Sequence, residues 1–198
     1  MSAYIATVAE IKTSLGITDT TDDTLLTEWI EGVQGKFDIE CGRRFLYAAS
    51  ETEYFDGGVH ALYVRRYPIA SITSIHVDSD QGWASDSLLA STDYRVVAVR
   101  GRIHYAYGST QWPEGIQNIR VIYAGGFVKS DGSAATYVDA AELDALRRAL
   151  YLQVGFEWRN RQNLGLNSLN AEGVSVNVAP AELLPEVKAI LHRFKRLV

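Results

Sequence analysis

The 198-residue chain is 47% hydrophobic and 22% charged, a composition typical of a globular domain built around one buried core. Its 19 basic and 24 acidic residues give a net charge of −5, which argues against tight binding of duplex DNA but not against a wall past which DNA slides. A single cysteine excludes an internal disulfide and any multi-cysteine metal site. The apolar runs are too short to cross a membrane and the N-terminus has no secretory signal pattern, so a cytoplasm is the expected place of synthesis.

Two helices are predicted at the start of the chain. Thr7 and Glu10 have the spacing of a capping box, and Gly16 suits the position after a helix end, so a short helix is expected between them. Apolar residues then recur at steps of three and four, which predicts a longer helix over about residues 22–41. Cys41 lies on the apolar face of that helix and is expected to be a buried small hydrophobic residue, not a nucleophile.

The middle of the chain is predicted to be β structure. Arg100-Gly101 suits a hairpin turn between two short apolar segments. Segments rich in Tyr, Val and Ile, separated by turn signals, predict strands over residues 52–55, 62–65, 72–77, 94–99, 102–107 and 116–123. An antiparallel sheet or a small barrel is expected from them.

The last third returns to helix. Asp139 marks a helix start, and apolar spacing continues to about Asn160. A polar loop is expected over residues 161–172 and one short strand over 174–178. Pro185 suits the first turn of a final helix.

These elements predict an α+β fold in one domain over residues 1–198. The helical ends, residues 1–45 and 138–198, are expected to form a bundle. The β-rich segment, about residues 50–128, is expected to be an insertion between them. No internal repeat or low-complexity linker requires a further domain boundary.

A catalytic or metal site is not indicated by any motif. Nucleophile elbows, P-loops and zinc-protease motifs are missing from the sequence. The loop that begins at Asp78 does not fit an EF-hand, because its twelfth position is Leu89 where a bidentate glutamate is needed. His76 and His104 fall in predicted strands and are expected to face solvent, although they could meet across neighbouring strands. No catalytic, cofactor-binding or metal residue is therefore predicted.

Three arginine pairs, at positions 43–44, 65–66 and 147–148, could contact phosphates. They are scattered through an acidic chain, so solvation or pairing with carboxylates is the favoured interpretation. If they gather on one surface, a protein contact explains them as well as a DNA contact does.

The order of the helical segments carries a family resemblance. The segment from Val8 to Ile17, the acidic break at residues 18–23 and the long helix that ends in Gly42-Arg43 resemble the head–tail connector (adaptor) proteins of long-tailed bacteriophages. Those proteins open with a short capped helix, an acidic break and a long amphipathic helix that ends near a Gly-Arg. The resemblance covers both helical ends, about half to two thirds of the chain.

Further segments are similar to the same family. Residues 66–69 (Arg-Tyr-Pro-Ile) followed by 72–75 (Ile-Thr-Ser-Ile) look like its entry into the sheet. Residues 150–161 are similar to its penultimate helix, which ends in an aromatic–Arg/Glu–Asn–Arg signature, and residues 184–196 match its terminal helix. Residues 78–110 depart from the pattern, because this part is longer and richer in strands than in shorter members.

The resemblance implies a structural virion protein of the phage neck. It implies a ring of about twelve copies, docked beneath the portal, that extends the DNA channel and joins the DNA-filled head to the tail. The implied partners are the portal protein, neighbouring copies of the chain, a downstream neck or tail protein and genomic DNA, which passes without specific binding. The implied location is the head–tail junction of the virion, after synthesis in a bacterial host cytoplasm. No cofactor, membrane or enzymatic activity is implied.

Interaction residues are predicted on exposed segments whose charges can meet between subunits. The final helix has a basic face, the N-terminal break is acidic, and the asparagine-rich loop after residue 161 is expected to order on assembly. The predicted interaction residues are Lys188, Arg193, Lys195, Arg196, Asn163, Asn167, Asn170, Asp19, Asp22 and Asp23.

Other functions remain open at this point. The first alternative is another neck component, such as a tail-completion or stopper protein. A DNA-packaging factor would need clustered basic residues and a steep salt dependence. A small α+β enzyme would need a pocket of titratable groups with shifted pKa values.

Overall fold

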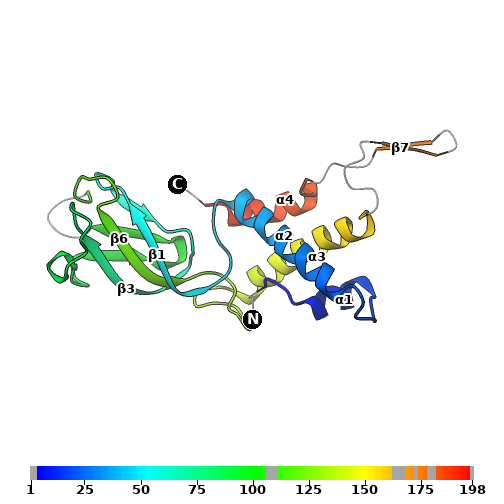
Figure 1. Cartoon of the computed structure of the whole chain (residues 1–198), viewed down its shortest axis with the longest axis horizontal. Helices are drawn as coiled ribbons and strands as arrows, with labels where there is room; N and C mark the ends of the chain where they lie inside the picture. The colour runs from blue at the N-terminus through cyan, green and yellow to red at the C-terminus, as the bar shows by residue number, and fades with distance from the viewer. Residues whose placement is uncertain (1–3, 106–110, 162–167, 172–173, 178–181, 197–198) are drawn as a thin grey trace. The chain divides into compact units, whose positions relative to one another are not determined.

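The computed structural model describes residues 4–105, 111–161, 168–171, 174–177 and 182–196 (Figure 1). It contains helices and antiparallel sheets, which confirms the α+β class. The chain divides into two compact units. The β unit comprises Arg43–Leu143, and the helical unit comprises Tyr4–Gly42 and Asp144–Arg196.

The β unit contains two three-stranded antiparallel sheets. The first has the order β1 (Ala48–Phe55), β6 (Ile119–Gly125), β3 (Ile69–Val77). The second has the order β2 (Ala61–Tyr63), β5 (Arg102–Tyr105), β4 (Tyr94–Val97). Single-turn 3₁₀ helices, η1 (Ser85–Ser87) and η2 (Ala98–Arg100), lie before and after β4. The expected hairpin at Arg100-Gly101 is confirmed, because β4 and β5 pair across this turn.

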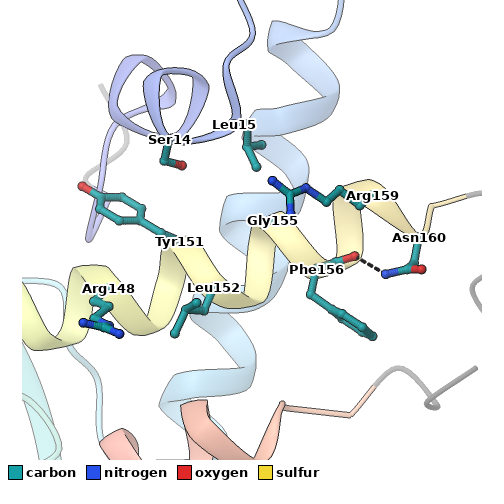
Figure 2. Close-up of a pocket in the computed structure, with 9 residues that line it drawn as sticks. All are labelled: Ser14, Leu15, Arg148, Tyr151, Leu152, Gly155, Phe156, Arg159 and Asn160. Atoms are coloured by element: carbon teal, nitrogen blue, oxygen red, sulfur yellow. Dashed lines mark hydrogen bonds between the residues drawn. The ribbon is translucent and has the colours of Figure 1, made fainter.

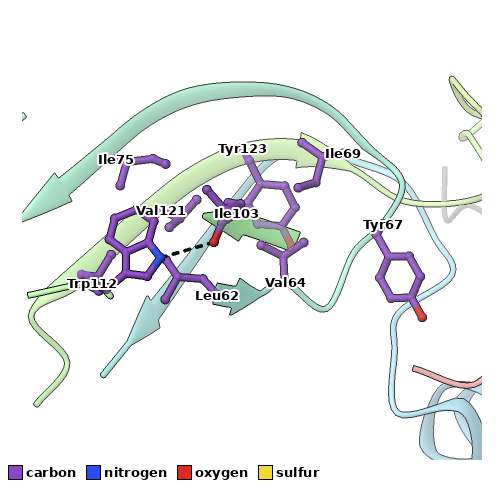
Figure 3. Close-up of a cluster of buried hydrophobic side chains, with 10 residues drawn as sticks. Leu62, Val64, Tyr67, Ile69, Ile75, Ile103, Trp112, Val121 and Tyr123 are labelled. Carbon is purple, nitrogen blue, oxygen red and sulfur yellow. Dashed lines mark hydrogen bonds between the residues drawn. The ribbon is translucent and has the colours of Figure 1, made fainter. Parts of the chain in front are cut away.

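The two sheets pack face to face around one apolar core. Figure 3 shows Leu62 and Ile103 from the second sheet pointing toward Val121 and Tyr123 of the first. Trp112 closes the same cluster, and its indole N–H donates to the Ile103 carbonyl over 3.3 Å. The expected sheet or small barrel is thus a pair of three-stranded sheets, and every strand of the second has only three or four residues.

Tyr123 places one polar group inside this core. Its hydroxyl donates to the Glu53 carboxylate and accepts from the Arg66 backbone N–H over 3.1 Å. Burial raises the pKa of the Tyr123 phenol, and the negative charge of Glu53 raises it further. The folded protein therefore holds this phenol in its neutral form.

The raised pKa of Tyr123 makes the stability of the β unit pH-dependent. In the unfolded chain the phenol ionises at about pH 10. Above that pH the unfolded state therefore binds fewer protons than the folded state. The free energy of unfolding should therefore be unaffected below about pH 10 and fall as the pH rises above it. Tyr123→Phe should flatten this alkaline slope in urea unfolding, whereas Tyr54→Phe, at an exposed tyrosine, should keep it. Equal slopes in both variants would contradict this origin.

The helical unit confirms the predicted N-terminal helices. α1 (Val8–Leu15) begins at the capping box of Thr7 and Glu10, and Gly16 ends it with φ of 72°. α2 (Asp23–Cys41) ends at Gly42, whose φ is 61°. Both glycines adopt a left-handed conformation that residues with a Cβ rarely take.

The C-terminal elements agree with the prediction only in part. α3 (Ala140–Arg159) and α4 (Pro185–Leu191) form as expected, and α4 continues as the 3₁₀ turn η3 (His192–Phe194). The predicted loop over residues 161–172 is wrong for its last part, because β7 (Ser168–Ala171) pairs with β8 (Val174–Asn177) as an antiparallel hairpin. The segment Ser-Leu-Asn-Ala has no β-branched or aromatic residue, so pairing with β8 overrides its weak intrinsic preference.

Candidate interaction surfaces

A buried polar network connects three helices of the helical unit. The Lys36 ammonium of α2 lies 2.7 Å from the Glu157 carboxylate of α3, and the Gln153 side chain donates to the same carboxylate over 2.7 Å. Gln153 is fully buried, and its carbonyl accepts the backbone N–H of Leu184, next to α4, over 2.9 Å. One glutamine thus links the start of α4 to α3, and one glutamate links α3 to α2.

An aromatic pair and a buried cysteine support the same packing of the helices. Trp29 of α2 and Trp158 of α3 meet edge to face with centroids 6.3 Å apart. At the other end of α2, Cys41 is buried and lies 3.6 Å from the Leu191 carbonyl. Its burial against this carbonyl agrees with the expected packing role.

An open groove lies where the end of α1 meets α3. Figure 2 shows Ser14 and Leu15 of α1 opposite Tyr151 and Gly155 of α3. A Cβ at Gly155 would lie 3.2 Å from a methyl group of Leu15, so glycine allows the two helices to approach here. The groove measures about 490 Å³, and its lining residues are Ser14, Leu15, Arg148, Tyr151, Leu152, Gly155, Phe156, Arg159 and Asn160.

The groove is lined by aromatic and aliphatic side chains between two arginines. The Ser14 hydroxyl donates to the Ile11 carbonyl over 2.8 Å. Arg148 is largely exposed and lies 3.5 Å from Glu186, a pair that contributes little to stability at such exposure.

The predicted basic residues gather around the C-terminal end of α2. Lys195 lies 2.8 Å from Glu40, whose carboxyl pKa it lowers through this hydrogen bond. Lys188 lies 3.3 Å from Glu182. The backbone N–H of Arg196 donates to the Cys41 carbonyl over 2.9 Å, whereas Arg193 is exposed and forms no ion pair within the described residues.

The predicted acidic residues lie at the opposite end of α2. Asp23 pairs with Lys12 over 2.6 Å, and Asp22 precedes the helix without a capping bond from its side chain. Asp19 is exposed, and the hydrogen bond that the Thr21 backbone donates lowers the pKa of its carboxyl. The rise of a 19-residue helix separates the two charged ends by about 28 Å.

The asparagine-rich segment gives less information. Asn163 and Asn167 lie outside the described residues. Asn170 lies in β7, where its backbone is paired opposite Ser175. The predicted roles of all ten interaction residues therefore stay predictions, and the structure separates the seven charged ones into a basic end and an acidic end of the helical unit.

The predicted surface position of His76 is wrong. His76 is 8% exposed, and its ring lies 3.1 Å from the Ser87 hydroxyl because the segment around η1 covers this end of β3. His104 lies in the other sheet and does not pair with it. Across the residues that the structure describes, no three His, Cys, Asp or Glu side chains gather as a metal site would require.

The arginine pairs serve different purposes. Arg43 is buried, with its guanidinium 3.5 Å from the ring centroid of Tyr67 and 4.9 Å from that of Phe45. Arg66 pairs with Glu51 over 3.0 Å. Arg65 is exposed, as are Arg95 and Arg100, which the pair pattern does not include. Among the described helices, none has the length and apolar content that crossing a bilayer requires.

The groove residues were also missed by the sequence analysis. Arg148, Leu152 and Phe156 are four residues apart and form a second stripe on α3, beside the core stripe that includes Leu150 and Val154. This spacing is visible in the sequence. It indicates a second apolar face, but the sequence alone does not show that the end of α1 forms its other wall.

Part of the chain matches a known protein family. Residues 5–88 match the model of the family described as "Phage gp6-like head-tail connector protein". The match extends from before α1 to the end of η1, somewhat less than half of the chain. The predicted resemblance to head–tail connector proteins is thus confirmed over this part. None of the curated protein sequences compared is significantly similar to the chain.

Chains in three solved structures share the fold of this chain over nearly its whole length. A chain in the "Neck of empty GTA particle computed with C6 symmetry" has a TM-score of 0.62 at 15% identity, covering 100% of this chain and 94% of that one. The "Virion of native gene transfer agent (GTA) particle" gives 0.57 at 15%, with the same coverage. The "Neck of native GTA particle computed with C12 symmetry" gives 0.54 at 16%, covering 96% and 88%. These likenesses establish a common fold.

Proposed function

We propose that this chain is a structural protein of a virion neck, one copy in a ring that joins the portal of the DNA-filled head to the tail. The family match over residues 5–88 carries the proposal. The fold shared with chains of neck and virion particles supports it along the rest of the sequence. In this proposal the chain is not an enzyme, and DNA passes through the ring toward the next neck or tail protein.

The ring is supported by symmetry and by charge. Two of the similar chains come from necks computed with C6 and C12 symmetry. A cyclic ring needs two different complementary surfaces on each copy. The helical unit offers an acidic end with Asp19 and Asp22 and a basic end with Arg193, and we assign these ends to neighbouring copies. Lys188 and Lys195 contribute less, because carboxylates of the same chain already pair with them.

We further infer that the helices from both ends of the chain form one bundle and that the β unit is inserted between them. The ion pair of Lys36 with Glu157 and the contact of Trp29 with Trp158 support this arrangement. In this arrangement the two units act as one connector domain over residues 1–198.

Gene deletion tests the proposed role. Particles made without this chain should be DNA-filled heads and separate tails, and the purified protein should restore their joining in vitro. If tails join without the chain, the connector role is wrong. If the heads lack DNA, the chain acts in packaging. If the heads made without this chain already carry a ring but still do not join tails, the chain belongs to a later neck or tail-completion step.

A charge swap tests the proposed contact between copies. Arg193→Glu and Asp19→Lys should each reduce ring formation on heads, because each places like charges across the interface. The double variant should restore it, since the swapped charges again attract one another. Lys129→Glu, in the β unit, controls for net charge. Single variants that form rings as the wild type does would contradict the assignment of these ends.

A further inference from the structure

The sheet formed by β2, β5 and β4 has one outward face that is basic. The register places Tyr63 opposite Arg102 and Arg102 opposite Val97, and the next row places Arg95 opposite His104. Leu62 and Ile103 point into the core (Figure 3), so the residues that alternate with them point outward. Arg95 and Arg102 therefore lie diagonally on the same face of neighbouring strands.

Two further arginines extend this face at one end of the sheet. Arg100 lies in η2, directly after β4, and Arg65 lies two residues after β2. The backbone N–H of Val64 donates to the Gly101 carbonyl over 2.9 Å, which places positions 65 and 100 beside each other. Arg65, Arg95 and Arg100 are exposed. We name Arg65, Arg95, Arg100 and Arg102 the basic face.

The basic face has no compensating negative charge on its own strands. The three strands read Ala-Leu-Tyr, Arg-Ile-His-Tyr and Tyr-Arg-Val-Val, without an acidic residue. None of its four arginines forms an ion pair with a carboxylate of the described residues. Glu53 accepts the backbone N–H of Arg65 over 2.9 Å, but its carboxylate also accepts the Tyr123 hydroxyl of the core. Cations of the helical unit such as Lys36 and Lys195 are, by contrast, paired.

We propose that the basic face binds the phosphate backbone of duplex DNA without reading its sequence. Unpaired arginines on neighbouring strands suit the closely spaced phosphates of a duplex and release its counterions. Arginine is also enriched at protein interfaces, so an acidic protein surface is the competing partner that the experiment must separate from DNA. The net charge of −5 makes the contact weak. The inference does not depend on the neck role, because the purified chain can be tested.

Fluorescence anisotropy with a labelled random-sequence duplex, titrated at several salt concentrations, tests the proposal. The double variant Arg95→Gln/Arg100→Gln should weaken binding about tenfold at low salt and reduce the slope of log K against log salt by about 2, because each lost phosphate contact contributes about 0.9. Exchanging the duplex sequence should leave the affinity unchanged. The control Lys129→Gln/Arg161→Gln removes the same net charge at residues that are not part of the face and should shift the affinity less than twofold. Circular dichroism and urea unfolding establish that both variants fold.

Three results would overturn the proposal. The first is wild-type protein that binds no duplex at low salt, and the second is an equal loss of affinity in the control. The third is a double variant that keeps its DNA affinity but loses self-association in sedimentation velocity, because the face would then contact an acidic protein surface. Joining of tails to heads is scored separately, so failure of DNA binding leaves the neck role open to its own test.

Discussion

Gly57→Ala is expected to unfold the β unit or to destabilise it by about 3 kcal/mol or more, the range of changes that force a backbone to move. A Cβ built on Gly57 would lie 1.6 Å from the Pro113 carbonyl oxygen and 2.7 Å from its carbonyl carbon. These are backbone atoms, so no side-chain rotation relieves the clash. The segment around Pro113 must shift if alanine is accommodated.

That shift would break a buried set of hydrogen bonds. The Gly57 N–H donates to the Gly115 carbonyl over 2.8 Å and to the side-chain oxygen of Asn118 over 3.0 Å. Asn118 is 1% exposed and donates to the Pro113 carbonyl over 3.0 Å. Leaving these groups unsatisfied adds about 1–3 kcal/mol for each buried polar atom.

Gly35→Ala is the matched control in α2. A Cβ there would meet no atom within 4 Å, so alanine should increase the free energy of unfolding by about 0.5–1 kcal/mol through its higher helix propensity. Urea unfolding followed by circular dichroism compares the two substitutions. If Gly57→Ala is as stable as the wild type, the close approach of residues 57 and 113 is wrong.

Glu157→Leu is the second large expected loss, about 2–4 kcal/mol in the helical unit. Glu157 is 7% exposed, and its carboxylate accepts from both Lys36 and Gln153. Removing it leaves the Gln153 side-chain N–H donors with the Glu182 carbonyl, at 3.3 Å, and takes from the partly buried Lys36 ammonium the carboxylate that lies 2.7 Å from it. The orphaned groups account for most of the expected loss.

A double-mutant cycle separates these contributions. Lys36→Met combined with Glu157→Leu should recover part of the lost stability, because the ammonium that loses the Glu157 carboxylate is removed as well. Glu40→Leu breaks the more exposed pair with Lys195 and should cost less than about 1 kcal/mol. Additive losses at positions 36 and 157 would show that the pair is not coupled.

Local signals explain how much of the fold the sequence predicts. The capping box of Thr7 and Glu10 and the glycines at 16 and 42 determine helix ends through neighbouring atoms, so the bounds of α1 and α2 are predicted to within about one residue. The order β1-β6-β3 depends on pairing between distant segments, which periodicity does not show.

The errors have the same physical origin. β7 contains no strongly strand-forming residue and is recognisable only through its partner β8. His76 follows buried Ile75 in the chain, and alternation therefore predicts an exposed side chain. The segment around η1 returns to cover it, a tertiary contact that strand periodicity does not encode. The basic face was missed for a similar reason, because its arginines come from β4, β5, the turn η2 and the segment after β2.

The predicted interaction residues show what composition does indicate. Asp19 and Arg193 are predicted to be exposed charges, and both are exposed. Asp23, Lys188 and Lys195 are predicted on the same grounds but pair within the chain, because their carboxylate or ammonium partners are brought close only by the packing of the helices. Charged residues in the sequence thus predict which side chains lie on the surface. Which of them remain available to another molecule depends on the ion pairs that the fold creates.

The most direct test of the neck role is to mix the purified chain with DNA-filled, tailless heads of its own virus, sediment the heads and image the bound complex. The proposal predicts stoichiometric binding as a ring beneath the portal, with the DNA channel continuing through its centre. Heads with a demonstrably open portal vertex that bind no ring would contradict it.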